Sequence, residues 1–420
     1  MSKVVLAYTG ALDNLICIHW LRTVKNLKVV TYSGNFGQLE HLEEVGERAL
    51  EAGAISAHIA DMRERFLREY CFRALRAGAR YESGYVLSSA LSRPPLAQEL
   101  VRIAQEEGCE AIAHGCRGIG NDQVRLETYI GTLAPHLRIL APLHELGLKT
   151  PEDDHQYAVR WNIARPNDPP VRASYNVDQN LWGVALQLGP KADPWMEPPD
   201  DTYIMTSKIS DAPDKPTYLD VSFEEGLPTM IDYQRMEPVA MVEMLNRLGA
   251  RYAIGRLDVM EDRISGLKAR EIYEAPAAVL LHQAHTALEE LTLDREVFQF
   301  RDVMARRYAD LAYRGRWFTA FREAIDAWFD IVAKPVTGTV KLKLLGGTSL
   351  VVGRQSPYSL FRTDLLAFDG DAESRTMRRR RAESEFGKKT NPDSDVPGTA
   401  NRQTDTPKPG SPGSDFGRRG

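Results

Sequence analysis

The chain has 420 residues, a formal net charge of −5 and 43% hydrophobic residues. This length predicts two or three domains, and the composition predicts a soluble globular protein with a large core. The negative charge argues against nucleic acid as the main partner, and no apolar run approaches the ~20 residues of a transmembrane helix. The four scattered cysteines indicate reduced thiols and the N-terminus lacks a signal-peptide pattern, so we expect a cytoplasmic protein that binds no membrane.

Strands and helices alternate in the first part of the chain. Strands are predicted at residues 3–8, 28–33, 57–62, 110–115 and 137–143, and helices at 14–24, 39–53, 63–77 and 94–108. This spacing predicts an α/β domain in which helices cover both faces of a parallel sheet. Because ligands bind beyond the carboxyl ends of such strands, the loops after Tyr8, Ser33 and His114 are expected along one edge.

After about residue 165 the pattern becomes that of an α+β domain. Proline-rich segments are followed by predicted hairpins at 218–232 and 336–353 and helices at 237–248, 276–312 (broken once) and 316–332. From residue 372 the chain is polar and carries an arginine run at 378–381. We expect a disordered tail there, either simply solvated or with the arginines as a docking patch. The predicted domains are residues 1–165, 166–370 and 371–420.

Residues 113–127, AHGCRGIGNDQVRLE, have the composition of a ligand-binding corner. An apolar strand leads into a loop with Gly115, Gly118 and Gly120, and Asn121 and Asp122 follow as candidate N-cap residues of a helix. A strand, a glycine loop and a helix N-terminus together can bind an anion. The alternative is an ordinary strand-to-helix turn with a capping Asp, and spacing alone does not separate the two.

This stretch resembles the argininosuccinate synthase signature HG-x-TGKGNDQVRFE. The segments KVVLAYTGALD, YESGYVLSSALSRP and GRLDVMEDRISGLKAREIYEAP resemble the same family in the same order, over residues 3–369. The resemblance implies an N-terminal nucleotide-binding domain of the adenine nucleotide alpha hydrolase-like type, followed by an α+β synthetase domain. It also implies an ATP-dependent, AMP-forming ligase that joins citrulline to aspartate through a citrullyl-adenylate, and a homotetramer, although the tail departs from the helical tail of the family.

The resemblance places the nucleotide loop after the first strand, where the family has YSGGLDTS. The implied ATP-binding residues are Ala7, Tyr8, Thr9, Gly10, Ala11, Leu12, Asp13, Asn14 and Leu15, with Gly34 and Gly115. Ala11 adds a methyl group at a position where a positive φ would favour glycine, and Asn14 and Leu15 replace two hydroxyl residues. Asp13, which with Asp122 is an implied catalytic residue, either holds Mg²⁺ that accompanies ATP or caps the helix. Without its relatives, TGALD is equally an ordinary turn.

The resemblance also implies two amino-acid sites. The citrulline residues are Tyr85, Ser89, Asn121, Arg125, Asn176, Ala185, Glu261 and Tyr273, and the aspartate residues are Arg117, Asn121 and Asp122. A guanidinium at 125 suits a carboxylate and a carboxylate at 261 suits an ammonium group, although the two could instead form a surface ion pair.

Several ligand positions depart from the family pattern. Asn176 and Ala185 stand where the family has serine, Arg117 stands for threonine and Ile119 for lysine. Arg117 could pair with a substrate carboxylate, replace the lost lysine near phosphate, or fill the site. The function is therefore argininosuccinate synthesis, the same adenylate chemistry on another amino acid, or non-catalytic ligand binding. His282 and His285, three residues apart in a predicted helix, favour packing over a metal site.

Overall fold

The computed structural model describes residues 2–38, 42–82, 84–118, 120–163, 176–187, 193–199 and 202–361. These residues belong to one compact unit. The predicted tail, residues 371–420, and Ile119 lie outside the described residues. Within the described ranges, no helix has both the length and the apolar character needed to cross a bilayer.

A five-stranded parallel sheet forms the first half, as the alternation of strands and helices predicted. Its strands are β1 (Lys3–Ala7), β2 (Lys28–Asn35), β3 (Ser56–Asp61), β4 (Ala111–Ala113) and β5 (Arg138–Leu140), in the order β3-β2-β1-β4-β5. Leu6 pairs with Thr31 on one side and with Ala113 on the other. The strand order reverses at β1 and β4, which places a ligand crevice beyond the carboxyl ends of these two strands.

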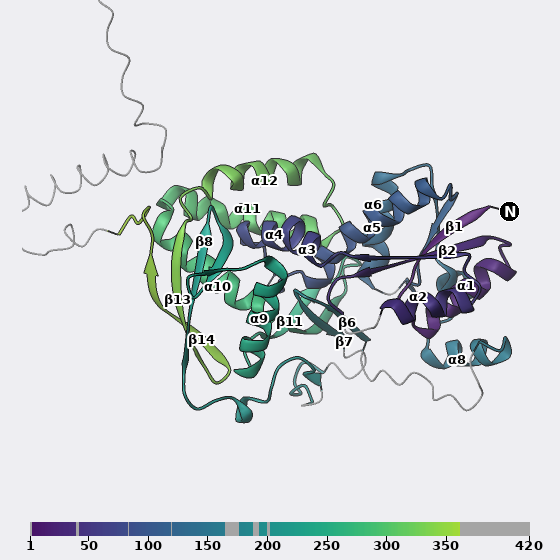
Figure 1. The fold of residues 1–420 in the computed structure, drawn as a ribbon, viewed down its shortest axis with the longest axis horizontal. Helices are drawn as coiled ribbons and strands as arrows, with labels where there is room; N and C mark the ends of the chain where they lie inside the picture. Colours follow the sequence, from purple (N-terminus) through teal and green to yellow (C-terminus); the bar gives the residue numbers. More distant parts are fainter. Residues whose placement is uncertain are drawn as a thin grey trace, which may run out of the picture. The chain divides into compact units, whose positions relative to one another are not determined.

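Helices cover both faces of this sheet. On one side lie α1 (Leu12–Thr23), α2 (Leu42–Glu51), α7 (Pro142–Leu146) and α8 (Pro151–Arg160), and on the other α5 (Ser88–Glu106) and α6 (Asn121–Leu133) (Figure 1). Side chains of β1 alternate between the two layers, since Val4 and Leu6 join one buried cluster and Val5 joins the other. The carboxyl ends of the strands are thereby left open between two helical layers.

The segment between β3 and β4 differs from its prediction. The helix expected at 63–77 consists of α3 (Arg63–Phe66), a π-helical turn at Leu67–Cys71 and α4 (Phe72–Arg76). The helix expected to begin at residue 94 begins at Ser88, with Pro94 and Pro95 inside it. The Tyr85 hydroxyl accepts hydrogen bonds from the backbone amides of Ser89 (3.0 Å) and Ala90 (3.4 Å), which satisfies donors of the first turn. A tyrosine three residues before the helix thus supplies an acceptor to the first turn of a helix that local propensity would start later.

Two antiparallel sheets form the second half. One has the order β10-β9-β8-β13-β14, with strands β8 (Thr217–Glu224), β9 (Leu227–Ile231), β10 (Gln234–Arg235), β13 (Gly338–Leu345) and β14 (Thr348–Gln355). It contains both predicted hairpins. The other has the order β11-β12-β7-β6, with strands β6 (Asn176–Asn180), β7 (Gly183–Gln187), β11 (Arg256–Asp262) and β12 (Lys268–Glu274). The sequence did not predict this second sheet, because Glu261, Glu271 and Glu274 are charged residues on its buried positions.

The remaining helices pack around these sheets. They are α9 (Pro238–Arg251), α10 (Pro276–Thr292), α11 (Arg295–Tyr313) and α12 (Ala320–Val332), with a short 3-10 turn at Ile209–Asp211. The predicted break in residues 276–312 falls at Leu293–Asp294, where Asp294 accepts a hydrogen bond from the amide of Val297 at 2.9 Å and caps α11. The C-terminus of α11 carries Tyr313 back toward the first half of the chain.

Candidate active site

The loop after β1 is built around one glycine in a left-handed conformation. Gly10 has φ 83°, and a Cβ atom there would lie 3.1 Å from the side chain of Val45 in α2. Ala11, the N-cap position of α1, has φ −71°. The expectation that alanine is strained at position 11 is therefore wrong, because the positive φ falls on the neighbouring glycine. Arg48 of α2 donates to the Gly10 carbonyl at 2.6 Å and holds the loop against that helix.

Asn14 ties this loop together from inside. Its Oδ1 accepts hydrogen bonds from the amide of Thr9 (2.6 Å) and the hydroxyl of Thr9 (3.2 Å), and its Nδ2 donates to Asp13 Oδ1 at 3.1 Å. A Cβ atom at Gly115 would lie 2.7 Å from Asn14 Nδ2, so only glycine permits the loop after β4 to approach this closely. Leu15 packs against the core cluster beneath α1. The substitutions at 14 and 15 thus serve the loop's internal structure.

Asp13 and Arg117 lie beside each other at the mouth of this loop. The N-terminus of α1 has no side-chain cap, so Asp13 does not cap it. Arg117 Nη2 lies 3.8 Å from Asp13 Oδ2, and its guanidinium forms a two-point ion pair with Asp154 of α8, one bond of which measures 2.9 Å. Burial raises the pKa of the Asp13 carboxyl, and Arg117 opposes that rise. The arginine that replaces a small hydroxyl residue therefore lies on the nucleotide-loop side of the corner.

Two stacked tyrosine pairs surround a buried carboxylate. Tyr85 stacks on Tyr273 with ring centroids 4.0 Å apart, and Tyr81 stacks on Tyr313 at 3.7 Å. The Tyr273 hydroxyl donates to Glu261 Oε2 at 2.8 Å, and the Tyr313 hydroxyl donates to Glu261 Oε1 at 2.7 Å. Burial raises the pKa of Glu261, while these two hydroxyl donors and Arg125 lower it. The site therefore holds a buried carboxyl group that is surrounded by aromatic rings.

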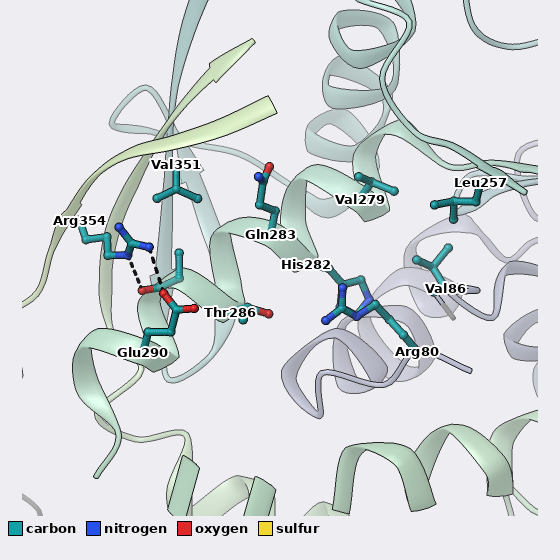
Figure 2. A pocket seen from close by; sticks show the side chains of 12 residues that line it. Arg80, Val86, Leu257, Val279, His282, Gln283, Thr286, Glu290, Val351 and Arg354 are labelled. Carbon is teal, nitrogen blue, oxygen red and sulfur yellow. Dashed lines mark hydrogen bonds and ion pairs between the residues drawn. The ribbon is translucent and has the colours of Figure 1, made fainter. Parts of the chain in front are cut away.

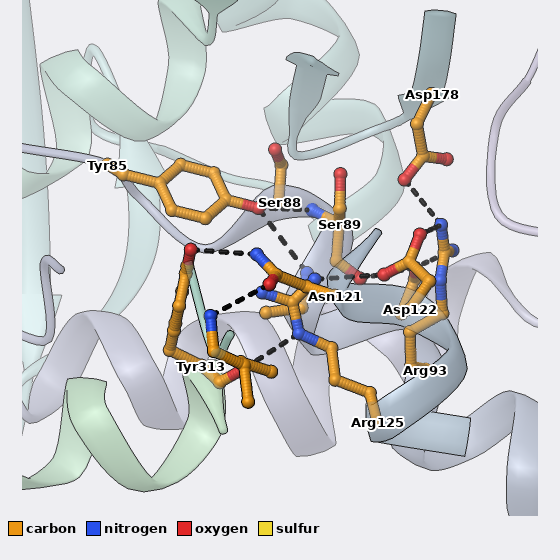
Figure 3. A network of polar contacts seen from close by, with 12 residues as sticks. Tyr85, Ser88, Ser89, Arg93, Asn121, Asp122, Arg125, Asp178 and Tyr313 are labelled. Atoms are coloured by element: carbon orange, nitrogen blue, oxygen red, sulfur yellow. Dashed lines mark hydrogen bonds and ion pairs between the residues drawn. The ribbon is translucent and has the colours of Figure 1, made fainter. Parts of the chain in front are cut away.

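The first turn of α6 joins this pocket to the glycine loop. Asn121 donates to the Tyr313 hydroxyl at 2.8 Å and accepts from the amide of Ile264 at 2.9 Å. Asp122 accepts from Arg125 Nη1 at 2.9 Å and from Arg93 Nη2 at 2.8 Å, as Figure 3 shows. The expectation that Asn121 and Asp122 cap the helix is wrong, because Gly120 is the N-cap residue and no side chain caps it.

Arg125 and Asp122 share one electrostatic network. Arg125 is 3% exposed, donates through Nε to the Tyr313 carbonyl at 2.7 Å and lies 4.7 Å from the Tyr313 ring. Arg93 also donates to Asp178 of β6 at 2.5 Å. Loss of solvent would raise the pKa of Asp122, but Arg93 and then Arg125 hold it at about 2. Asp122 is therefore a permanent anion between two guanidinium groups at physiological pH.

The other expected citrulline residues lie on neighbouring elements. Ser89 is buried in the first turn of α5, beside Tyr85. Ala185 of β7 lies opposite Tyr273 on one side and Asp178 on the other. Asn176 begins β6, although its side chain is outside the described part of the chain. Gly34 lies near the end of β2, where a Cβ atom would come within 2.7 Å of the Phe36 ring.

The structure thus gathers the expected residues into two clusters. The nucleotide cluster contains the loop at residues 7–15, Gly115 and Arg117, and the amino-acid cluster contains Tyr85, Ser89, Asn121, Asp122, Arg125, Glu261 and Tyr273. The segment 114–122 runs from one cluster to the other. A strand end, a glycine loop and a helix start therefore bring the residues expected to bind the nucleotide close to those expected to bind the amino acids.

Sequence reasoning missed four residues of these clusters. They are Arg93, Asp154, Asp178 and Tyr313. Arg93 lies within YESGYVLSSALSRP, so that segment carried a signal for it. Tyr313 had none, because its contacts with Arg125 and Asn121 span 188 and 192 residues of the chain.

Comparisons with known proteins agree with this geometry. Residues 3–164 match the arginosuccinate synthase N-terminal HUP domain, and residues 175–382 match the arginosuccinate synthase C-terminal domain. Proteins named argininosuccinate synthase from Chlorobium luteolum and Chlorobium limicola are each 44% identical over 367 residues, which is 87% of this chain and 91% of theirs. The protein of that name from Chlorobaculum parvum is 44% identical over 368 residues, with the same two coverages.

Proposed function

The chain belongs to the argininosuccinate synthase family, and from this premise we propose how its own residues divide the reaction. The protein is an ATP-dependent, AMP-forming ligase that makes argininosuccinate from citrulline and aspartate. The ureido oxygen of citrulline attacks the α-phosphate of ATP, and pyrophosphate leaves. The amine of aspartate then attacks the ureido carbon of the citrullyl-adenylate, and AMP leaves as the new C–N bond forms. Such a reaction depends mainly on orientation and on stabilising phosphate charge.

Citrulline is held by the amino-acid cluster. Glu261 binds the α-ammonium group, and Arg125 binds the α-carboxylate through the guanidinium nitrogen that Tyr313 and Asp122 do not engage. This assignment is supported because Glu261 and Arg125 are both buried and both contact Tyr313, so the two side chains lie close to the same tyrosine. Tyr85, Ser89, Asn121 and Tyr273 shape the walls. Asn176 and Ala185 belong to the adjacent β6–β7 hairpin. This common anchoring is the single observation that carries the proposal.

ATP is held by the loop after β1. Residues 7–15 with Gly34 and Gly115 form its site, and the amides around Gly10 and the N-terminus of α1 face the phosphates. Asp13 fits a magnesium ion, because its carboxylate lies at the loop mouth without a capping role. One carboxylate together with substrate phosphates is a common ligand set for Mg²⁺. When bound, the ion neutralises charge that develops on the phosphates.

Aspartate lies between the two clusters. Asn121 and Asp122 orient it from the first turn of α6, and Asp122, with its pKa held at about 2 by Arg93 and Arg125, acts as a fixed anion rather than as a proton acceptor. Arg117 contributes to this region, and its contacts with Asp13 and Asp154 support a role next to the phosphates.

The larger organisation follows the same proposal. We place one domain boundary near residue 165, because one family match ends at 164 and the next begins at 175. We place the other near residue 370 from the change in composition, although the second family match continues to residue 382. We also propose a homotetramer, which the family resemblance implies, and a cytoplasmic location, which the scattered cysteines and the N-terminal sequence favour.

One assay tests the function. The purified chain is incubated with ATP, Mg²⁺ and citrulline, with and without aspartate, and AMP and pyrophosphate are measured together with argininosuccinate. We expect equimolar AMP, pyrophosphate and argininosuccinate when both amino acids are present. AMP formation only with a different amino acid would contradict citrulline and aspartate as substrates, and failure to bind ATP by calorimetry would contradict the enzyme itself.

A further inference from the structure

A second cavity lies apart from both substrate clusters. It measures about 350 Å³ and is bounded by α10, by β14 and by the segment around residues 80–86 (Figure 2). Its polar lining comes from Arg80, His282, Gln283, Thr286, Glu290 and Arg354. No residue expected to bind ATP, citrulline or aspartate lines it. This volume is large enough for a small organic molecule.

His282 faces this cavity without a hydrogen-bond partner. Its side chain on α10 is 2% exposed, and neither ring nitrogen has a partner among the described residues. A buried polar group left unpaired costs about 1–3 kcal/mol, so such groups normally contact something. Burial, and secondly Arg80, lower the pKa of His282 well below its ordinary value, so the ring is neutral and offers one N–H donor and one acceptor.

Arg80 supplies a cation at the same cavity. It forms no hydrogen bond or ion pair with another described residue, whereas Arg354 is already engaged by Glu290 at 3.0 Å and by the Ala287 carbonyl at 3.1 Å. Arg80 is exposed, so a molecule in the cavity can reach its guanidinium group. Desolvation and the neighbouring Arg301 lower the pKa of Arg80, while Glu289 and Asp302 oppose that change. Arg80 is thus the uncommitted cation of the cavity.

The remaining walls favour a carboxylate over a phosphate. Val86, Leu257 and Val279 give the cavity an apolar side, and Glu290 is the one carboxylate among its lining residues. A dianionic phosphate would lie near that carboxylate and would gain nothing from the apolar wall. A monoanion with a short hydrocarbon part suits both features.

We propose that this cavity binds a small organic carboxylate, with its carboxylate held by Arg80 and His282 and its apolar part against Val86, Leu257 and Val279. This site is separate from the proposed catalysis and does not depend on it. Val86 follows Tyr85 directly in the chain, so the ligand lies one residue from the citrulline pocket. From the sequence we interpret His282 as a packing residue, because nothing local shows that it lines a cavity.

Calorimetry with butyrate tests the proposal on the full chain. We expect saturable binding with a Kd on the order of 1 mM, as suits a ligand of few atoms. Arg80→Gln should weaken binding at least ~10-fold, since it removes the fork that holds the carboxylate. His282→Gln should weaken it as well. Arg80 forms no hydrogen bond or ion pair with another described residue, so we expect Arg80→Gln to fold. This variant therefore still tests the proposal if His282→Gln does not fold.

Controls separate this cavity from the substrate sites. Arg247→Gln changes a side chain that is 72% exposed on α9 and should leave butyrate binding unchanged. Arg93→Gln alters the amino-acid cluster and should also leave it unchanged. Butanol and inorganic phosphate, which keep only the apolar part or only the charge, should bind at least ~10-fold more weakly. Binding that survives Arg80→Gln, equal binding of either control compound, or no saturable binding of butyrate would each overturn the proposal.

Discussion

The Tyr313 hydroxyl donates a 2.7 Å hydrogen bond to Glu261, from the last residue of α11 to a strand that lies 52 residues earlier in the chain. The same hydroxyl accepts from Asn121 at 2.8 Å. One phenol therefore connects the carboxylate expected to bind the citrulline ammonium group with the first turn of α6.

Removing that hydroxyl should weaken citrulline binding selectively. In Tyr313→Phe the ring still stacks on Tyr81, but Glu261 and Asn121 each lose a buried partner, which costs about 1–3 kcal/mol. We expect the KM for citrulline to rise ~10-fold while the KM for ATP stays unchanged. Steady-state kinetics with each substrate varied would measure this. Tyr218→Phe, at a side chain that is 55% exposed, is the matched control. Equal changes for ATP and citrulline would contradict the assignment.

Glu261→Gln should keep or raise the stability of the fold while it lowers the activity. Burial raises the pKa of Glu261, so ionising it costs folding free energy as pH rises from the unfolded carboxyl pKa of about 4.3 through the folded value. Glutamine cannot ionise, so at pH 7 to 8 the variant should melt at or above the wild-type Tm, with a difference that shrinks toward pH 4. Loss of the charge that meets the citrulline ammonium group should lower kcat/KM for citrulline ~30-fold. If Glu261→Gln instead melts below the wild type at neutral pH, the ionised Glu261 carboxylate does not destabilise the fold.

Asp122→Asn should remove part of the acid sensitivity of the fold. Because the folded pKa is about 2 and the unfolded one is ~3.9, the ion pairs of Asp122 stabilise the protein above pH 4 and are lost as pH falls toward 2. The side chain is one-third exposed, which limits the effect to on the order of 1 kcal/mol. Urea unfolding between pH 3 and 6 would show a flatter profile for the variant. Glu51→Gln on the exposed end of α2 should keep the wild-type profile.

Two variants test the nucleotide loop against each other. Asn14→Ala removes the acceptor for both the amide and the hydroxyl of Thr9, so the KM for ATP should rise ~10-fold. Ala11→Gly should leave that KM unchanged, because φ −71° suits alanine, and should lower stability by about 0.4–1 kcal/mol. If Ala11→Gly instead improves ATP use, the methyl group at position 11 hinders the phosphates.

Arg117 needs a paired substitution. Arg117→Thr alone would leave Asp154, which is 5% exposed, without its cation, at a cost of about 3–5 kcal/mol. Combining it with Asp154→Asn removes both charges and should restore stability. In this double variant we expect the KM for ATP to rise ~10-fold with little change for aspartate, because Arg117 lies beside Asp13. A rise confined to the KM for aspartate would place Arg117 on the amino acid instead. Asp154→Asn alone is the control.

Local patterns in the sequence determined much of the fold but less of the site. The parallel sheet was predictable because its strands are short apolar runs separated by amphipathic helices. The β11–β12 hairpin was not, because the buried positions at 261, 271 and 274 carry glutamates whose burial depends on Tyr273, Tyr313, Arg263 and backbone amides from distant segments. The pattern of hydrophobic residues cannot reveal hydrogen bonds and ion pairs of this kind.

The site residues show the same division. Gly10 and Asn121 could be singled out from the pattern of a turn and a helix start, and Arg125 from the resemblance to the family. Tyr313 and Asp154 were not, because each acts on a motif residue from another part of the fold. Likewise, Ala11 fits its position because the neighbouring Gly10 has the positive φ. A residue-by-residue comparison with the family sequence cannot show this.

The glycine at the start of α6 has a consequence for how the chain can be divided. Since Gly120 brings no side chain to the helix end, the polar groups of the next two residues reach outward, to the β11–β12 loop, to α11 and to α5. A fragment that ended at residue 165 would keep the whole parallel sheet, but Asn121 would lose its hydrogen-bond partners. We therefore expect that the two halves of this protein do not behave as modules that evolved independently and can complement each other. We also expect that the C-terminal half can be exchanged between relatives only when residues 121 and 313 are exchanged together.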